Sequence, residues 1–215
     1  MNAAPITTLY LARHGQSEWN NQSRVTGQLD PLLTDKGRLQ SRALADCLRG
    51  EALHAIYSST LVRTVETAAP TAAATGLPIV REAALCEIHM GVLQGRHRDE
   101  RDAQAQALWA RWKAEPWQLR VPGGERFDEF AQRVGAALRA ILHRHAGQRV
   151  LVVGHGATNR VLLGTLLQWP RDRWFELRPR NKFCYRLELG EGAPRIATYT
   201  LGGSRSGRCE EGFVT

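Results

Sequence analysis

The stretch Leu9-Tyr10-Leu11-Ala12-Arg13-His14-Gly15-Gln16 decides the fold, because an apolar run leads directly into an arginine, a histidine and a glycine. A short apolar run that ends at glycine is typical of a buried strand. In open α/β sheets, ligands bind beyond the carboxyl ends of the strands. Arg13 and His14 are therefore expected at a functional site, and Gly15 is expected to allow a tight turn and a close approach of the backbone to a bound group.

A second stretch is built in the same way. The apolar run Val150-Leu151-Val152-Val153 is followed by Gly154-His155-Gly156. A lone histidine is more often structural than functional. Two histidine–glycine pairs, each at the end of a buried strand, favour a functional role for both His14 and His155.

Strands and helices alternate through most of the chain, which predicts an α/β fold: a three-layer α/β/α sandwich with a mostly parallel central sheet. Pro70 is expected to kink or end the helix in which it lies. The predicted helices are residues 34–48, 61–76, 127–142 and 157–168, and the further predicted strands are residues 55–59, 78–80, 183–189 (half-exposed) and 196–201 (hairpin partner of 183–189).

The chain is expected to form a single domain over residues 1–215. One or two helices are predicted between residues 96 and 120, and we expect a helical cap near residues 90–120. The tryptophans there, Trp109, Trp112 and Trp117, fit inward packing better than a stacking platform for nucleic acid. The Gly-, Ser- and charge-rich tail from about residue 202 is expected to be mobile.

Composition narrows the function classes. The chain has a formal net charge of +8, but its arginines form no block or dense stripe, so we expect no nucleic-acid partner. A basic site that attracts anionic substrates fits the same charge. There is no apolar run long enough for a membrane span and no signal peptide at the start, so a cytoplasmic protein without a membrane partner is expected. The scattered cysteines suggest neither disulfides nor zinc.

Five segments, in this order, resemble the histidine phosphatase superfamily, the phosphoglycerate-mutase-like proteins. The similarity runs from residue 9 to about residue 160. The segments are Arg13-His14-Gly15-Gln16-Ser17-Glu18-Trp19-Asn20, Tyr57-Ser58-Ser59-Thr60-Leu61-Val62-Arg63-Thr64 with Thr67-Ala68, Leu85-Cys86-Glu87 with Gly91 and Gly95, Pro122-Gly123-Gly124-Glu125, and Val152-Val153-Gly154-His155-Gly156.

The resemblance implies a phosphohistidine mechanism. His14 would be the nucleophile, and Arg13 and Arg63 would bind the phosphate oxygens through their planar forks of donors. His155 would be a further donor to the phosphoryl group. Glu87 would protonate the leaving alkoxide and then take a proton from the attacking water. The expected substrate-binding residues are Asn20, Thr26, Gly27 and Gly156.

Alternatives remain open for two of these residues. Arg63 could pair with Glu66 on a helix surface, and Glu87 could be an exposed loop carboxylate. The family reaction needs no metal, the chain shows no metal-ligand spacing, and no cofactor is expected. A homodimer is expected by analogy only.

Three functions are compatible with these motifs. The first is a metal-independent phosphatase that hydrolyses small phosphomonoesters through a phosphohistidine on His14. The second is a 2,3-bisphosphoglycerate-dependent phosphoglycerate mutase, and the third is a non-catalytic protein that binds phosphorylated ligands or nucleic acid. A mutase needs extra groups to hold its substrate, and Ile88-His89-Met90 and Ala157 are a weak set for that task. Hydrolysis of a small phosphorylated substrate is therefore favoured.

Overall fold

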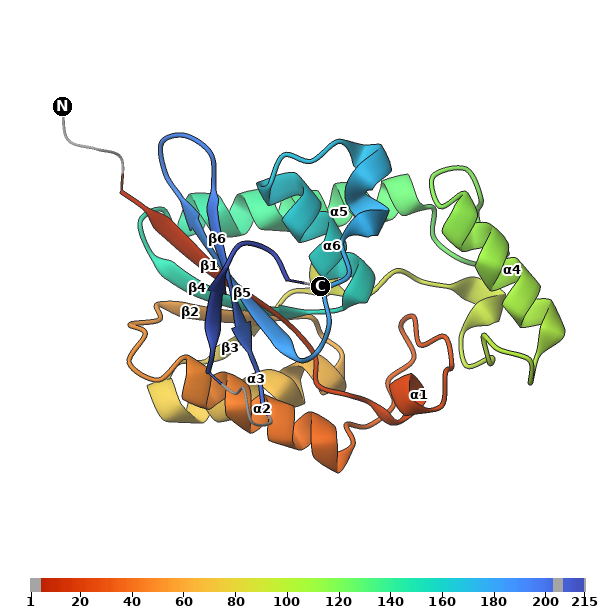
Figure 1. Cartoon of the computed structure of the whole chain (residues 1–215), viewed down its shortest axis with the longest axis horizontal. Coiled ribbons are helices and arrows are strands. Elements are labelled where there is room, and N and C mark those ends of the chain that lie inside the picture. The colour runs from red at the N-terminus through yellow and green to blue at the C-terminus, as the bar shows by residue number, and fades with distance from the viewer. Residues whose placement is uncertain (1–4, 203–206, 215) are drawn as a thin grey trace.

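The structure is a computed structural model that describes residues 5–202 and 207–214. In this part of the chain the strands form one sheet in the order β3-β2-β4-β1-β5-β6-β7 (Figure 1). The first four strands of that order are parallel, whereas β5, β6 and β7 pair in antiparallel fashion. The strands are β1 Thr7–Arg13, β2 Ala55–Ser58, β3 Ile79–Arg81, β4 Arg149–Gly154, β5 Phe183–Leu189, β6 Arg195–Thr200 and β7 Cys209–Glu211.

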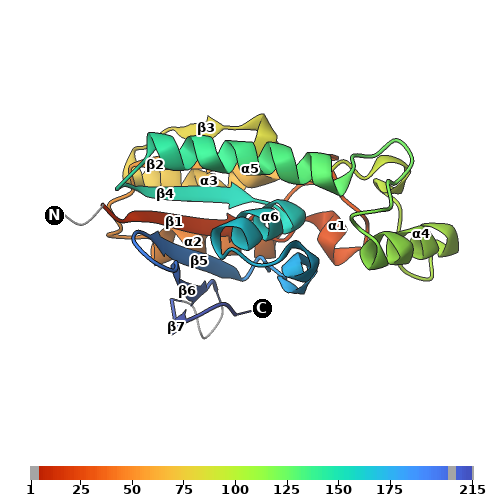
Figure 2. The same ribbon diagram turned by 90° about the horizontal axis from the view of Figure 1, so that it is seen from above.

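Helices cover both faces of the sheet, which confirms the predicted three-layer sandwich (Figures 1 and 2). On one face, Leu9 and Val152 pack with α5 and α6. On the other face, Tyr10 and Val153 pack with α2 and α3. The helices are α1 Glu18–Asn21, α2 Asp35–Cys47, α3 Val62–Thr75, α4 Ala103–Ala114, α5 Phe127–Arg144 and α6 Gly156–Leu166, with short 3₁₀ turns η1 Ala83–Leu85, η2 Gly91–Leu93 and η3 Arg171–Glu176.

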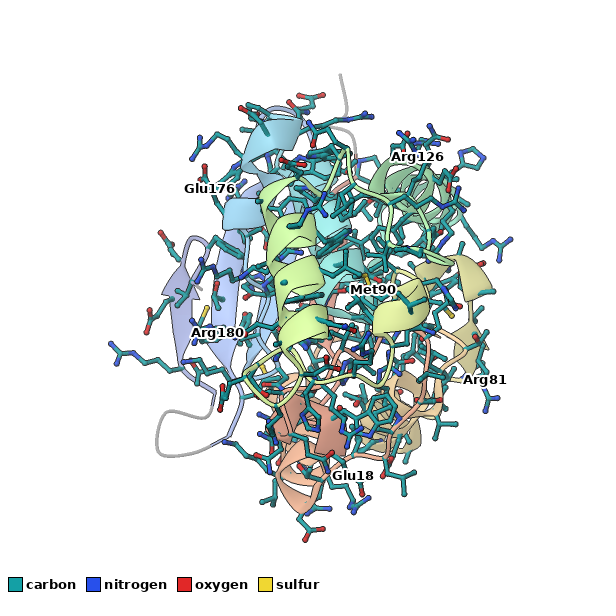
Figure 3. All side chains as sticks on the ribbon, turned by 90° about the vertical axis from the view of Figure 1, so that its right-hand side faces the viewer. Glu18, Arg81, Met90, Arg126, Glu176 and Arg180 are labelled. Carbon is teal, nitrogen blue, oxygen red and sulfur yellow. The ribbon has the colours of Figure 1, made fainter. Side chains whose placement is uncertain are left out.

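The carboxyl ends of β1 and β4 lie at the same end of the sheet. Strands β1 and β4 both run toward α4, which lies beyond their carboxyl ends (Figure 2). Figure 3 looks onto this end, where α4 crosses in front and Met90 lies beside it. The aromatic side chains of the segment pack inward as predicted: Trp112 is buried, and Trp109 stacks on it with ring centroids 5.3 Å apart.

Pro70 is predicted to kink or end its helix, and it does not end it, since α3 continues through it to Thr75. Proline has no N–H, so the carbonyl of Glu66 loses its usual helical donor. The hydroxyl of Ser41, on the neighbouring helix α2, lies 3.1 Å from that oxygen and 2.8 Å from the carbonyl oxygen of Thr67, so its one proton is shared between the two acceptors. A contact from another helix thus reaches the acceptor that proline leaves open.

Two expectations near the carboxyl end also need correction. The mobile tail was expected from about residue 202; residues 203–206 lie outside the described residues, but Cys209–Glu211 forms β7 on the edge of β6. The phenol of Tyr185 also donates to the carbonyl of Val214 at 3.1 Å. In addition, β5 is not half-exposed at its start, because Phe183, Cys184 and Tyr185 are all buried beside β1.

Across residues 5–202 and 207–214, no helix combines the length and the apolar character that crossing a membrane requires.

Candidate active site

A cavity of about 650 Å³ opens at the carboxyl ends of β1 and β4. It brings together eight of the nine residues predicted for the site, which are Arg13, His14, Asn20, Thr26, Gly27, Arg63, Glu87 and Gly156. The ninth, His155, is fully buried directly behind it, with its ring centroid 5.3 Å from that of His14. Residues up to 143 positions apart in sequence converge here because β1 and β4 are adjacent and parallel, with Arg13 opposite Gly154.

The hydrogen bond of His14 defines its tautomer. Its Nδ1 lies 2.7 Å from the carbonyl oxygen of Gly15, and a carbonyl can only accept, so Nδ1 carries the proton. Burial lowers the pKa of His14 well below the ordinary value for histidine, and the nearby charges of Arg63 and Arg13 lower it further. His14 is thus a neutral imidazole whose Nε2 keeps its lone pair.

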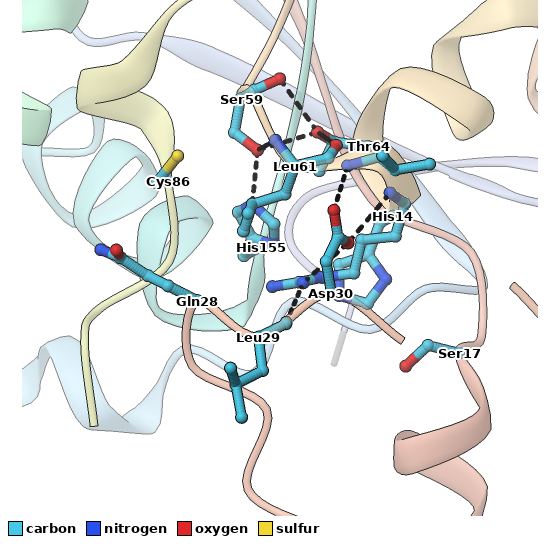
Figure 4. Close-up of polar contacts among 12 residues, drawn as sticks. His14, Ser17, Gln28, Leu29, Asp30, Ser59, Leu61, Thr64, Cys86 and His155 are labelled. Atoms are coloured by element: carbon cyan, nitrogen blue, oxygen red, sulfur yellow. Dashed lines mark hydrogen bonds and ion pairs between the residues drawn. The ribbon is translucent and has the colours of Figure 1, made fainter. Parts of the chain in front are cut away.

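His155 is held from behind by the hydroxyl of Ser59. The distance from Ser59 Oγ to His155 Nε2 is 2.8 Å, and the same hydroxyl contacts Thr64 Oγ1 at 2.8 Å (Figure 4). The other ring nitrogen, Nδ1, is buried and has no partner among the described residues. Burial, together with Arg63, His14 and Arg13, lowers the pKa of His155 well below its ordinary value, so this ring is neutral as well.

Residues 27–30 form the loop that holds the guanidinium of Arg63. Its Nη1 donates to the carbonyl of Leu29 at 2.6 Å and to Asp30 at 3.2 Å, and its Nη2 donates to the carbonyl of Gly27 at 2.8 Å. Two N–H groups are left over, on Nε and on Nη2, and the buried Nε has no partner. The alternative pairing with Glu66 is not formed, because Glu66 bonds to Arg38 instead.

Arg13 also has a buried N–H group without a hydrogen-bond partner. Its only hydrogen bond within the described residues is a long one of 3.5 Å to the carbonyl of Pro179, and its buried Nε is unpaired. Buried donors without acceptors are rare in native proteins, and the two arginines are therefore suited to bind an anionic ligand. Arg13, Arg63 and His155 therefore offer three unpaired nitrogens at one place, where the oxygens of a phosphoryl group could accept from Arg13 and Arg63.

Glu87 is half-buried and lies at the amino terminus of α6 rather than on an exposed loop. Its two carboxylate oxygens accept from the backbone N–H groups of Ala157 at 3.0 Å and Thr158 at 3.3 Å. A Cβ placed on Gly156 would lie 3.5 Å from Arg13 Nη1 and 3.6 Å from Glu87 Oε2. The carboxylate and the guanidinium thus flank Gly156, on the wall of the same cavity.

Arg133, on α5, holds the loop that presents Glu87. Its guanidinium donates to the carbonyls of Ala84, Cys86 and Glu87 at 2.8, 2.9 and 3.1 Å. The same side chain forms a two-bond ion pair with Glu125, at 2.6 and 2.9 Å. The sequence analysis did not single out Arg133, because an arginine on an amphipathic helix has the pattern of a surface residue.

Gly15 has a packing role that the sequence did not indicate. A Cβ at this position would collide with the carbonyl oxygen of Gly37. Glycine is therefore required by the packing of the β1 end against α2. The N–H of Gly15 is also occupied, because it donates to Thr67 Oγ1 at 3.0 Å.

The cavity contains cations that the sequence analysis missed. Besides Arg13 and Arg63, five basic side chains line it, which are Arg24, Arg98, Lys113, Arg160 and Arg178. Glu87 is the one carboxylate among the described lining residues. Over the described parts of the chain, no three His, Cys, Asp or Glu side chains are grouped so that they could hold a metal ion.

Known proteins resemble this chain in sequence and in structure. A sequence model of the histidine phosphatase superfamily (branch 1) matches residues 9–201. The chain is 38% identical over 194 residues to the probable phosphoglycerate mutase GpmB of Photorhabdus laumondii, covering 88% of each chain. It superposes on Bacillus stearothermophilus YhfR with a TM-score of 0.78 at 32% identity, covering 94% of this chain and 96% of that one. A mycobacterial glucosyl-3-phosphoglycerate phosphatase gives a TM-score of 0.78 at 29% identity, covering 93% and 100%.

Proposed function

The chain belongs to the histidine phosphatase superfamily, and on this premise we propose that it is a metal-independent phosphatase that hydrolyses small phosphomonoesters through a phosphohistidine on His14. The observation that carries the proposal is the tautomer of His14. The Gly15 carbonyl holds the proton on Nδ1, which leaves the Nε2 lone pair for attack on phosphorus. Around it, the unpaired N–H groups of Arg13 and Arg63 match the charge that develops on the phosphoryl oxygens.

In the first step, His14 Nε2 forms a bond to phosphorus and the bond from phosphorus to the ester oxygen breaks. The protonated carboxyl of Glu87 gives its proton to that oxygen, so the leaving group departs as a neutral alcohol. In the second step, water attacks the phosphohistidine while Glu87 accepts its proton. The phosphorus–nitrogen bond then breaks, which restores the Nε2 lone pair and releases inorganic phosphate.

His155 supports both steps if its Nδ1 carries a hydrogen. Its Nε2 must then accept from the Ser59 hydroxyl, 2.8 Å away. Thr64 Oγ1 and the backbone N–H of Leu61, at 2.8 and 3.2 Å from Ser59 Oγ, must then both donate to it, so that the one hydroxyl proton of Ser59 points at His155. This arrangement makes His155 a neutral donor to the phosphoryl group.

The direct test is to trap the intermediate. Wild-type protein, quenched during turnover of a radiolabelled phosphomonoester, should carry phosphate that is acid-labile and base-stable, as phosphohistidine is. His14→Asn should carry none and should show no turnover. Full activity in His14→Asn, or a label that survives acid, would contradict the proposal.

Phosphoglycerate mutase activity is the second candidate, favoured by the name of the relative that is 38% identical. The two functions are separated by supplying 3-phosphoglycerate with a 2,3-bisphosphoglycerate primer and measuring both 2-phosphoglycerate and inorganic phosphate. We expect phosphate release to dominate, because Ile88 and Met90, which follow Glu87, and Ala157, which follows Gly156, are uncharged and are a weak set for holding the substrate during a return transfer. Interconversion much faster than phosphate release would establish the mutase.

A further inference from the structure

The cavity carries far more positive charge than a phosphoryl group requires. Seven basic side chains line it against one carboxylate, that of Glu87. Two of the seven, Arg13 and Arg63, suffice for the phosphoryl oxygens in the proposed reaction. The side chains of Lys113 and Arg178 form no hydrogen bond or ion pair with any described residue, so no protein carboxylate neutralises them.

Two contacts hold the guanidinium of Arg160 at the cavity wall. Its Nε donates to the carbonyl of Leu177 at 3.1 Å, and its guanidinium carbon lies 4.6 Å from the ring centroid of Phe175. These two contacts fix the plane of the guanidinium and leave its terminal nitrogens without partners among the described residues. Burial, with the charges of Arg13 and Arg178, lowers the pKa of Arg160 to about 10, although the Glu87 carboxylate opposes the shift. A bound anion would relieve this repulsion.

Arg160 lies on the same side of α6 as Gly156, because it follows Gly156 by four residues. A Cβ placed on Gly156 would lie 3.5 Å from Arg13 Nη1, and Arg13, Gly156 and Arg160 all line the cavity. An anion on Arg160 and a phosphoryl group on Arg13 can therefore belong to one small molecule.

We propose that Arg160 and Arg178 form a second anion-binding subsite, and that the substrates are phosphomonoesters carrying a second anionic group. The claim about substrates rests on the proposed phosphatase function, whereas the subsite itself rests on the geometry of the cavity. A carboxylate and a second phosphate share the chemistry that the two arginines recognise.

Phosphonates test the subsite without turnover, because their carbon–phosphorus bond resists hydrolysis. Binding to the wild-type protein is measured by calorimetry for three series with matched chain lengths: alkylphosphonates, ω-phosphonoalkanoates and α,ω-alkylenediphosphonates. We expect the compounds with a second anion to bind about tenfold more tightly than the alkylphosphonate of the same length. The preference should peak at one chain length, because both subsites belong to one cavity, and the series with the larger preference identifies the second group as carboxylate or phosphate.

Arg178→Gln is the decisive variant, because Arg178 is exposed, whereas Arg160 also packs on Phe175 and bonds to the backbone. Arg178→Gln should reduce the preference severalfold, and Arg160→Gln, where it folds, should do the same. The matched control is Arg180→Gln, an exposed arginine two residues away that does not line this cavity. It should keep the wild-type preference.

The outcomes separate the two proposals. Equal binding of all three series, or an unchanged preference in Arg178→Gln, would overturn the subsite. A preference reduced equally by Arg180→Gln would also overturn it, because the effect would then come from the overall charge of the protein. Hydrolysis of p-nitrophenyl phosphate, which has no second anion, reports on the phosphatase alone: its absence in the wild type would overturn the proposed function and leave the binding result standing.

Discussion

Replacing Arg133 with methionine should remove the support of the Glu87 loop without deleting any side chain of the cavity wall, because Arg133 does not line the cavity. The substitution deletes the donors to the carbonyls of Ala84, Cys86 and Glu87. It also leaves the carboxylate of Glu125 without its ion-pair partner. The loop should then lose its fixed position relative to α6, and Glu87 with it.

The size of the effect follows from burial. Removing one partner of a buried ion pair costs about 3–5 kcal/mol. The side chains of Arg133 and Glu125 are not fully buried, since they are 25% and 18% exposed. We therefore expect the low end, about 3 kcal/mol. For a domain of this size that corresponds to a decrease in Tm of roughly 6–12 °C. Because general acid–base catalysis contributes roughly 10²–10⁴-fold, the decrease in kcat should approach that range.

The assay combines thermal unfolding with kinetics on two kinds of ester. Alkyl phosphates have poor leaving groups and need a proton from Glu87, whereas p-nitrophenyl phosphate needs much less help. Arg133→Met should therefore lose more kcat on the alkyl esters. Arg139→Met, which removes an exposed arginine from the same helix, is the control and should change neither property. An equal loss of kcat on both kinds of ester would refute the positioning role and leave Arg133 with a purely structural one.

Three further predictions concern the site itself. His14 and His155 are neutral in the folded state, whereas in the unfolded chain each takes up a proton below a pKa of about 6.5. The free energy of unfolding should therefore decrease as pH falls below 6.5, by about 1.4 kcal/mol per histidine and pH unit. Denaturant titrations at several pH values should show that about half of this slope is missing in His14→Asn. Glu87→Gln should lose kcat mainly on alkyl phosphates, and an equal loss on p-nitrophenyl phosphate would point to another acid. Activity should be unaffected by EDTA, and a loss that added magnesium, manganese or zinc restores would contradict the metal-independent mechanism.

The parts of the site that lie on strand ends could be predicted from the sequence. An apolar run that ends in His-Gly is a local pattern, and β1 and β4 each carry one. The adjacency of the two strands then brings His14 and His155 together. Arg63 has no such local signal, since Glu66 is nearby on the same helix, and it could be assigned only through the resemblance of its whole segment.

The parts of the fold and of the site that could not be predicted depend on contacts between segments far apart in the sequence. Arg133 bonds to carbonyls 46 to 49 residues earlier in the chain, and Arg160 is fixed by a carbonyl beyond the end of its own helix. Both residues are charged positions on helices, a pattern that usually indicates a solvated surface. Pro70 is tolerated because of a hydroxyl on another helix, which no pattern within α3 could show.

The two ends of the cavity have separate origins in the chain, and this has an evolutionary consequence. The proposed reacting groups, Arg13, His14 and His155, belong to strand ends that the sheet holds in register. Lys113 and Arg178 come from α4 and from the segment after η3, which contribute no strand to that sheet. Mutations in these two segments can therefore change which molecules are accepted while the chemistry stays intact, so a library confined to them is the rational starting point for redirecting the protein to new phosphorylated compounds.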